Sequence, residues 1–122
     1  MQRKYRNCKV KTSEGLVFDS KKEYKRYCEL KVMETAGLIT DLQRQVKYVL
    51  VPTQREPDTV GKRGGIHKGK VIEKEVAYIA DFVYALPTGE IVVEDTKGMR
   101  TKDYVIKRKL MLWIHKIRIK EI

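Results

Sequence analysis

Alternating apolar and polar residues mark three strands in the middle of the chain. We expect them over residues 46–51, from about 71 or 75 to 84, and over 90–97, because period-two alternation between turn residues is typical of half-buried strands. The segment 87–89, Pro-Thr-Gly, separates the last two strands and predicts a hairpin loop. One face of the middle strand should carry its larger apolar side chains, namely Val76, Tyr78, Ala80, Phe82 and Tyr84.

Helical periodicity before the strands predicts a first helix. Ser20 is a good N-cap, and Glu23, three residues later, completes a capping-box pattern. The helix should continue to about Thr35 and stop at Gly37, a favoured residue just beyond helix ends. Glu23 would lie at the edge of the apolar face, towards the sheet, while the basic residues crowd the other side: Lys21, Lys22, Lys25 and Arg26.

A second helix is expected to start near Thr101 or Asp103 and to run to about His115. Ile106, Leu110 and Trp113 repeat at helical spacing, with Ile114 adjoining, and predict a stripe that faces the core. A final strand over 117–122 alternates apolar with basic residues, as protected edge strands do.

These elements predict one domain over residues 1–122 with an α/β (α+β) fold. The order is helix, strand, strand, strand, helix, strand, and we expect a mixed sheet flanked by the helices. Two further segments complete the chain, a basic N-terminal segment, 1–15, and a long basic loop, 52–70. A loop of this length is either functional or disordered. Val10 and residues 16–18 would form a short hairpin at the end of the N-terminal segment.

The composition directs attention to nucleic acid. The 122 residues carry 27 Lys and Arg against 16 Asp and Glu, for a formal charge of +11, and such an excess favours DNA or RNA as a partner. An anionic membrane surface is the rival, but the sequence has no apolar run long enough to span a bilayer and no signal-peptide pattern. Cys8 and Cys28 are far apart and predict free thiols in a reducing cytoplasm.

Two carboxylates and a lysine on the hairpin carry the candidate chemistry. If Leu86 pairs with Glu90 across the loop, Asp81 falls directly opposite Asp95, where like charges repel. A divalent cation held by oxygen ligands would offset this repulsion. Lys97, two residues after Asp95, shares its face and adds positive charge. This combination suits the cleavage of a phosphodiester.

The arrangement resembles the PD-(D/E)xK nuclease superfamily over residues 16–122. Ala80-Asp81-Phe82 and the segment 94–98, Glu-Asp-Thr-Lys-Gly, form the centre of the resemblance, with Ala80 where the superfamily's name has proline. Segments 18–23 and 104–109 flank it. More narrowly, the chain resembles a family of small phage-encoded proteins. The resemblance implies a restriction-endonuclease-like core and a metal-dependent DNA endonuclease.

The same resemblance implies a role for each matching residue. Asp81 and Asp95 would bind Mg²⁺ or, in its place, Mn²⁺, and Lys97 would contact the attacking water or the phosphate. Glu23 matches a first-helix acid that is often a further metal ligand, although its capping role accounts for it equally well. The residues expected to contact DNA are Tyr104, Lys107 and Arg108 in the second helix, and Lys62 and Arg63 in the basic loop.

The substrate and the alternatives follow from the size and charge of the chain. With no room for a separate specificity domain, we expect recognition of DNA structure, with branched DNA and a Holliday-junction resolvase as the first candidate. A resolvase needs two active sites and therefore a homodimer. The competing hypothesis is a non-catalytic nucleic-acid-binding module with a nuclease-like fold. A ribosomal or other RNA-binding protein would fit the charge but leave the paired acids unexplained.

Overall fold

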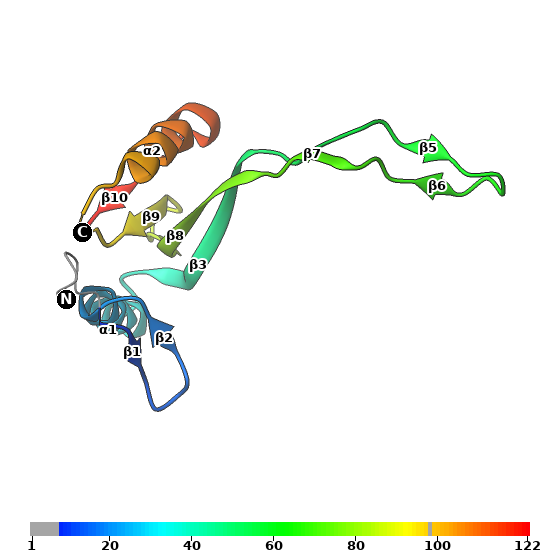
Figure 1. Cartoon of the computed structure of the whole chain (residues 1–122). Coiled ribbons are helices and arrows are strands. Elements are labelled where there is room, and N and C mark those ends of the chain that lie inside the picture. Colours follow the sequence, from blue (N-terminus) through cyan, green and yellow to red (C-terminus); the bar gives the residue numbers. More distant parts are fainter. Residues whose placement is uncertain (1–7, 98) are drawn as a thin grey trace, which may run out of the picture.

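The computed structural model describes residues 8–97 and 99–122. Its centre is a mixed four-stranded sheet in the order β10-β9-β8-β3, built from β3 (Thr40–Val51), β8 (Val76–Ala85), β9 (Ile91–Asp95) and β10 (Lys120–Glu121). The strands β3, β8 and β9 are antiparallel, and β10 runs parallel to β9 as a short edge strand. The helices α1 (Lys21–Thr35) and α2 (Lys102–His115) lie on opposite sides of this sheet (Figure 1). The expected mixed class and element order are therefore confirmed.

The helix ends form where the local sequence supplies caps. The Oγ of Ser20 accepts a hydrogen bond from the backbone N of Glu23 at 3.1 Å, and Thr101 caps α2 in the same way through the N of Tyr104. At the other end of α1, Gly37 has a φ of 77°, a conformation that costs glycine little. These contacts satisfy backbone groups that a helix terminus would otherwise leave unpaired.

The segment 52–70 is not the unstructured loop that we expected, because it contains three short paired strands. The strands β4 (Gln54–Arg55) and β7 (Val71–Glu73) form one ladder, and β5 (Thr59–Val60) and β6 (Ile66–His67) form a second. Together they make a narrow ribbon, the arm, that projects away from the sheet (Figure 1). The signal for it was weak, since the segment is short of alternating apolar residues.

The N-terminal hairpin is present as expected. β1 (Val10–Lys11) pairs antiparallel with β2 (Val17–Phe18). Residues 1–7 of the basic N-terminal segment lie outside the described residues.

Strand β8 does not keep its apolar side chains on one face, which corrects the expectation. Tyr78 and Ala80 pack in a cluster with residues of α2, whereas Phe82 and Tyr84 pack in a second cluster with Leu30 of α1. The change of face falls at Asp81. The partner strand is irregular at the same level, because Gln45, between the pairs Arg44↔Phe82 and Val46↔Ala80, has a φ of 53°. The irregularity of both strands places Asp81 between the two cores.

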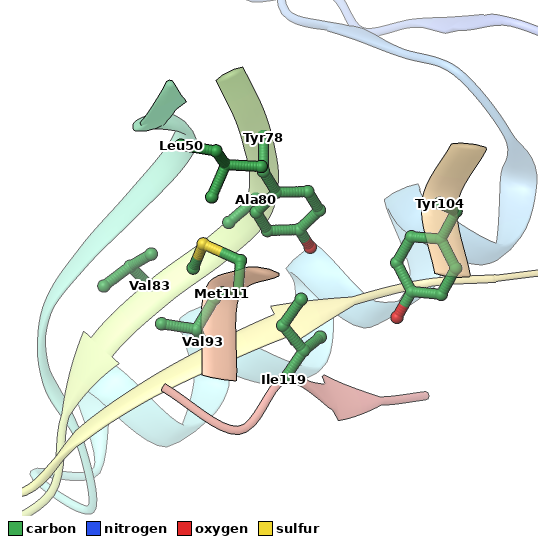
Figure 2. Packing of buried hydrophobic residues seen from close by; sticks show 8 residues of the cluster. All are labelled: Leu50, Tyr78, Ala80, Val83, Val93, Tyr104, Met111 and Ile119. Carbon is green, nitrogen blue, oxygen red and sulfur yellow. The ribbon is translucent and has the colours of Figure 1, made fainter. Parts of the chain in front are cut away.

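Most of the apolar stripe expected on α2 faces outward, which is a second correction, although Leu110 of this stripe packs against the core. Ile106 is 56% exposed, Trp113 is 76% exposed and Ile114 is 41% exposed. The helix instead buries Tyr104 and Met111, which are also seven residues apart. Figure 2 shows both side chains in the cluster with Val93 and Ile119. Helix α2 carries apolar residues on two faces, so periodicity alone does not select the buried one.

Candidate metal and phosphodiester site

The hairpin register brings the two candidate acids together. The N of Leu86 donates to the O of Glu90 at 2.8 Å, and the ladder continues to the pair Phe82↔Glu94. One residue further along this register, Asp81 lies opposite Asp95. The observed register agrees with the expected opposition of the two carboxylates, and the charge of Asp81 raises the pKa of Asp95.

Asp95 is a buried carboxylate with one oxygen left without a hydrogen bond. It is 1% exposed, and the hydroxyl of Tyr78 donates to its Oδ2. The Nζ of Lys97 lies 3.2 Å from Oδ1, close enough for an ion pair but without the alignment of a hydrogen bond, so Oδ1 has no hydrogen-bond partner among the described residues. Burial, reinforced by the charge of Asp81, raises the pKa of Asp95 to about 6.

Asp81 is fixed by the residue that follows Asp95. Its Oδ2 accepts hydrogen bonds from both the backbone N and the Oγ1 of Thr96, each at 2.8 Å. Both bonds reach the same oxygen, so Thr96 does not engage the second one. Asp81 is therefore oriented by β9 while its charge acts on the carboxylates around it.

Glu23 joins the acids from the first turn of α1. It is 2% exposed. Its Oε2 accepts from the backbone N of Asp19 at 3.2 Å, and its Oε1 accepts from the Nε2 of Gln45 at 3.1 Å. The pKa of Glu23 is raised to about 7, first by burial and then by the charge of Asp81. The capping role and a place in the acidic cluster thus coexist, as Asp81 influences both Glu23 and Asp95.

The carboxylate oxygens of Asp81 and Asp95 are suitable ligands for a hard cation, but the part of the chain that the structure describes supplies no third ligand that is free to bind it. Within the described residues, no group of three or more Asp, Glu, His and Cys side chains is arranged to hold a metal ion. Both oxygens of Glu23 already accept hydrogen bonds, so its ligation would require the loss of one of them. The buried, unbonded Oδ1 of Asp95 is the atom that most favours a cation, because an unpaired buried oxygen is costly.

A groove opens at Tyr78 and Lys97, two residues that contact Asp95, although neither Asp81 nor Asp95 lines it. It has a volume of about 300 Å³, and it lies where β8 has no β9 partner, since β9 ends at Asp95. Its lining comprises Ala77, Tyr78, Ile79, Lys97, Thr101, Asp103, Tyr104 and Lys107. The Nζ of Lys97 sits 4.5 Å from the centre of the Tyr104 ring, a cation–π distance. Lys97 is therefore held between the ring and Asp95 at the groove.

Residues 2–120 match the family described as Protein of unknown function (DUF1064). The chain belongs to this family. No curated protein and no solved structure matches it. The DUF1064 description states no activity, so the chemistry of this member has to be argued from its own side chains.

The expected DNA-binding residues of this DUF1064 member are dispersed. Lys107 lines the groove. Tyr104 is 5% exposed and packs in the core, so little of its side chain is accessible to DNA. Its ring instead contacts the Nζ of Lys97. Arg108 lies 3.6 Å from Glu121 and lines a separate cavity. Lys62 and Arg63 lie at the far end of the arm (Figure 1).

A buried ion pair behind the site was missed by the sequence analysis. Arg26 was expected on the solvated side of α1, but its Nε and Nη2 donate to the two oxygens of Glu94 at 2.8 and 2.7 Å. Glu94 is fully buried and also accepts from the hydroxyl of Tyr84. The signal was present, because a glutamate within a buried strand requires a basic partner.

No helix among the described residues is long and apolar enough to cross a membrane.

Proposed function

We propose that the protein is a metal-dependent deoxyribonuclease that hydrolyses DNA phosphodiesters. The observation that carries the proposal is the opposition of Asp81 and Asp95 on paired strands, with the Nζ of Lys97 3.2 Å from Asp95. The order α1, β3, β8, β9, α2, β10 supports a restriction-endonuclease-like core of the PD-(D/E)xK type.

Electrostatics explain why these acids favour a cation. Burial raises the pKa of Asp95 to about 6 and that of Glu23 to about 7, so ionisation near neutral pH opposes folding. Mg²⁺ or Mn²⁺ held by Asp81 and Asp95, with Glu23 as a further ligand, would relieve this cost. When bound, such a cation polarises the phosphoryl group and lowers the pKa of water.

The chain's own residues orient the reactants. Tyr78 fixes Asp95 through its hydroxyl, and Thr96 fixes Asp81. Lys97, steadied by the Tyr104 ring, would hold the attacking water or a phosphate oxygen and stabilise negative charge as it develops. Lys107, across the groove, would bind a neighbouring phosphate.

Cleavage assays test the proposal directly. Purified protein with Mg²⁺ or Mn²⁺ should cut DNA, while Asp81→Asn and Asp95→Asn should abolish cutting and retain DNA binding. Asp41→Asn is a matched control, because Asp41 is exposed at the start of β3 and its φ of 56° suits asparagine. Absence of cleavage on supercoiled, linear and branched DNA with either metal ion would refute the enzyme.

For the substrate, we propose branched DNA, cut as a Holliday-junction resolvase cuts it. Symmetric paired nicks in a four-way junction, with little cutting of linear duplex, are the expected result. A resolvase would act as a homodimer, and the exposed Ile106 and Trp113 of α2 offer an apolar surface for it. The exposed, unpaired Cys8 and Cys28 support a place in a reducing cytoplasm.

The second candidate is a nucleic-acid-binding module without catalysis. It is favoured by the hydrogen bonds that already occupy both oxygens of Glu23. Titration with Mn²⁺ separates the two functions: binding that is lost in Asp95→Asn supports the nuclease, and absence of Mn²⁺ binding supports the module.

A further inference from the structure

The arm is formed by two short strand ladders, and further hydrogen bonds join its two sides between them. At its base, Gln54 pairs with Glu73, and the N of Glu56 donates to the O of Lys70 at 2.8 Å. Further out, the N of Gly69 donates to the Oδ1 of Asp58 at 3.0 Å. At the end, β5 pairs with β6. Hydrogen bonds thus join the two sides of the arm at its base, in its middle and at its end.

Glycines make the narrow shape possible. Gly64 turns the chain at the tip with a φ of 83°, and the N of Gly61 closes the turn on the O of Gly65 at 2.7 Å. A Cβ on Gly69 would lie 1.8 Å from the O of Glu56, so no other residue fits there without moving the backbone. The two strands can approach this closely only because Gly69 has no side chain.

The outer part of the arm is basic and exposed. Beyond the hydrogen bond between Gly69 and Asp58, residues 59–68 contain no acid and three basic side chains, Lys62, Arg63 and Lys68, all exposed. Lys70 is also exposed, but it lies level with Glu56 across the ribbon. The cross-strand pair Val60 and Ile66 is also exposed, at 76% and 73%. A two-stranded ribbon has only marginal stability by itself, and these two apolar side chains do not contribute to either core.

We propose that the arm is a second contact for duplex DNA, separate from the groove beside Asp95. The proposal rests on the proposed function for its choice of partner. Three exposed basic side chains at the outer end, with no acid among them, fit a phosphate backbone, and a two-stranded ribbon is narrow enough to enter the major groove. Pairing of the arm with the arm of a second copy is disfavoured, because the outer ends of both arms carry basic side chains and no acid.

The length of the arm sets the position of this contact. From Pro52 to Arg63, at about 3.3 Å per residue, the ribbon extends roughly 35 Å. One turn of B-DNA has nearly the same length, about 34–36 Å or 10 base pairs. The tip should therefore contact the duplex about one helical turn or more from the groove.

Binding without divalent cations tests the arm independently of cleavage. Fluorescence anisotropy should show wild-type protein binding a duplex of about 24 base pairs at least tenfold more tightly than one of about 10 base pairs. Replacing Lys62, Arg63, Lys68 and Lys70 by alanine should remove most of this length preference. The same variant should reduce the salt dependence, the slope of log K against log salt, by roughly three to four units.

A matched control removes equal charge elsewhere. Alanine at Lys9, Lys11, Lys21 and Lys25, all exposed, should weaken binding and retain the length preference. If both variants lose the preference equally, or if wild-type protein shows none, the arm proposal is overturned. If the wild-type protein does not cleave DNA with Mg²⁺ or Mn²⁺ but still prefers the longer duplex, only the proposed nuclease activity is refuted.

Limited trypsin digestion provides a test on unaltered protein. Trypsin should cut after Lys62 and Arg63 in the free protein, and a duplex of about 24 base pairs should protect both sites where one of about 10 base pairs does not. Sedimentation tests the alternative partner. If the arm variant converts a dimer into a monomer while its DNA binding is unchanged, the arm binds a second copy and the DNA contact is excluded.

Discussion

The variant Asp95→Asn should make the metal-free protein more stable at alkaline pH. Asp95 is 1% exposed and close to Asp81. Asparagine has nearly the same shape, and its Oδ1 can still accept the hydrogen bond from Tyr78. The substitution therefore removes a buried charge while keeping the packing, and it should stabilise the fold even though it abolishes the proposed activity.

The size and pH range of the effect follow from the pKa. Folding raises the pKa of Asp95 from 3.8 to about 6, and each unit corresponds to about 1.4 kcal/mol. The free energy of unfolding therefore decreases as pH rises from about 4 to 6, because Asp95 loses its proton in the unfolded chain at a lower pH than in the folded one. Above pH 6 the ionised carboxylate costs the fold on the order of 3 kcal/mol, and a chain of this length gains about 4 °C in Tm per kcal/mol.

Thermal unfolding in EDTA, followed by circular dichroism, measures the difference. At pH 8 the Tm of Asp95→Asn should exceed that of the wild type by roughly 10 °C, and the gap should close towards pH 4. The control Asp41→Asn should track the wild type at both pH values. A variant that is equal to or less stable than the wild type at pH 8 would show that Lys97 and Tyr78 fully compensate the buried charge.

The remaining predictions concern the ion pair, the cation and the basic side chains. Arg26→Met should destabilise the fold by about 3–5 kcal/mol in urea unfolding, because it leaves Glu94 buried without a partner; adding Glu94→Gln should recover much of the loss, and no recovery would contradict the pairing. Mn²⁺ should raise the Tm of the wild type at pH 8 but not that of Asp81→Asn, and an equal rise in both would place the ion elsewhere. Lys97→Ala should lower the cleavage rate at least a hundredfold without changing DNA affinity by a similar factor, whereas equal losses would make it a binding residue. Lys107→Ala should reduce the salt slope of DNA binding by about one unit, and an unchanged slope would remove it from the interface.

Local sequence was sufficient for the hairpin and the helix caps. The turn after Leu86 fixes the register, and the register alone places Asp81 opposite Asp95. Ser20 and Gly37 mark the ends of α1 through contacts within a few residues. These features depend on neighbours in the chain, so they can be predicted without knowledge of the tertiary structure.

Features that depend on tertiary packing could not be predicted in this way. The pairs Ile106–Trp113 and Tyr104–Met111 have the same spacing on α2, and only the packing against β8 and β9 selects the second. Arg26 turns inward because Glu94, distant in sequence, needs a counter-ion. The face switch at Asp81 likewise depends on the irregular backbone of Gln45 on another strand, and no pattern within β8 signals it.

The outward position of Trp113 makes the protein its own optical reporter. The sequence has a single tryptophan, and this side chain is 76% exposed on α2 beside Lys116. Its emission should therefore resemble that of indole in water, with ready quenching by iodide. A blue shift of this emission at higher protein concentration would indicate self-association through α2. If the emission does not change with concentration, the surface around Trp113 remains exposed to solvent. Neither measurement needs an attached label.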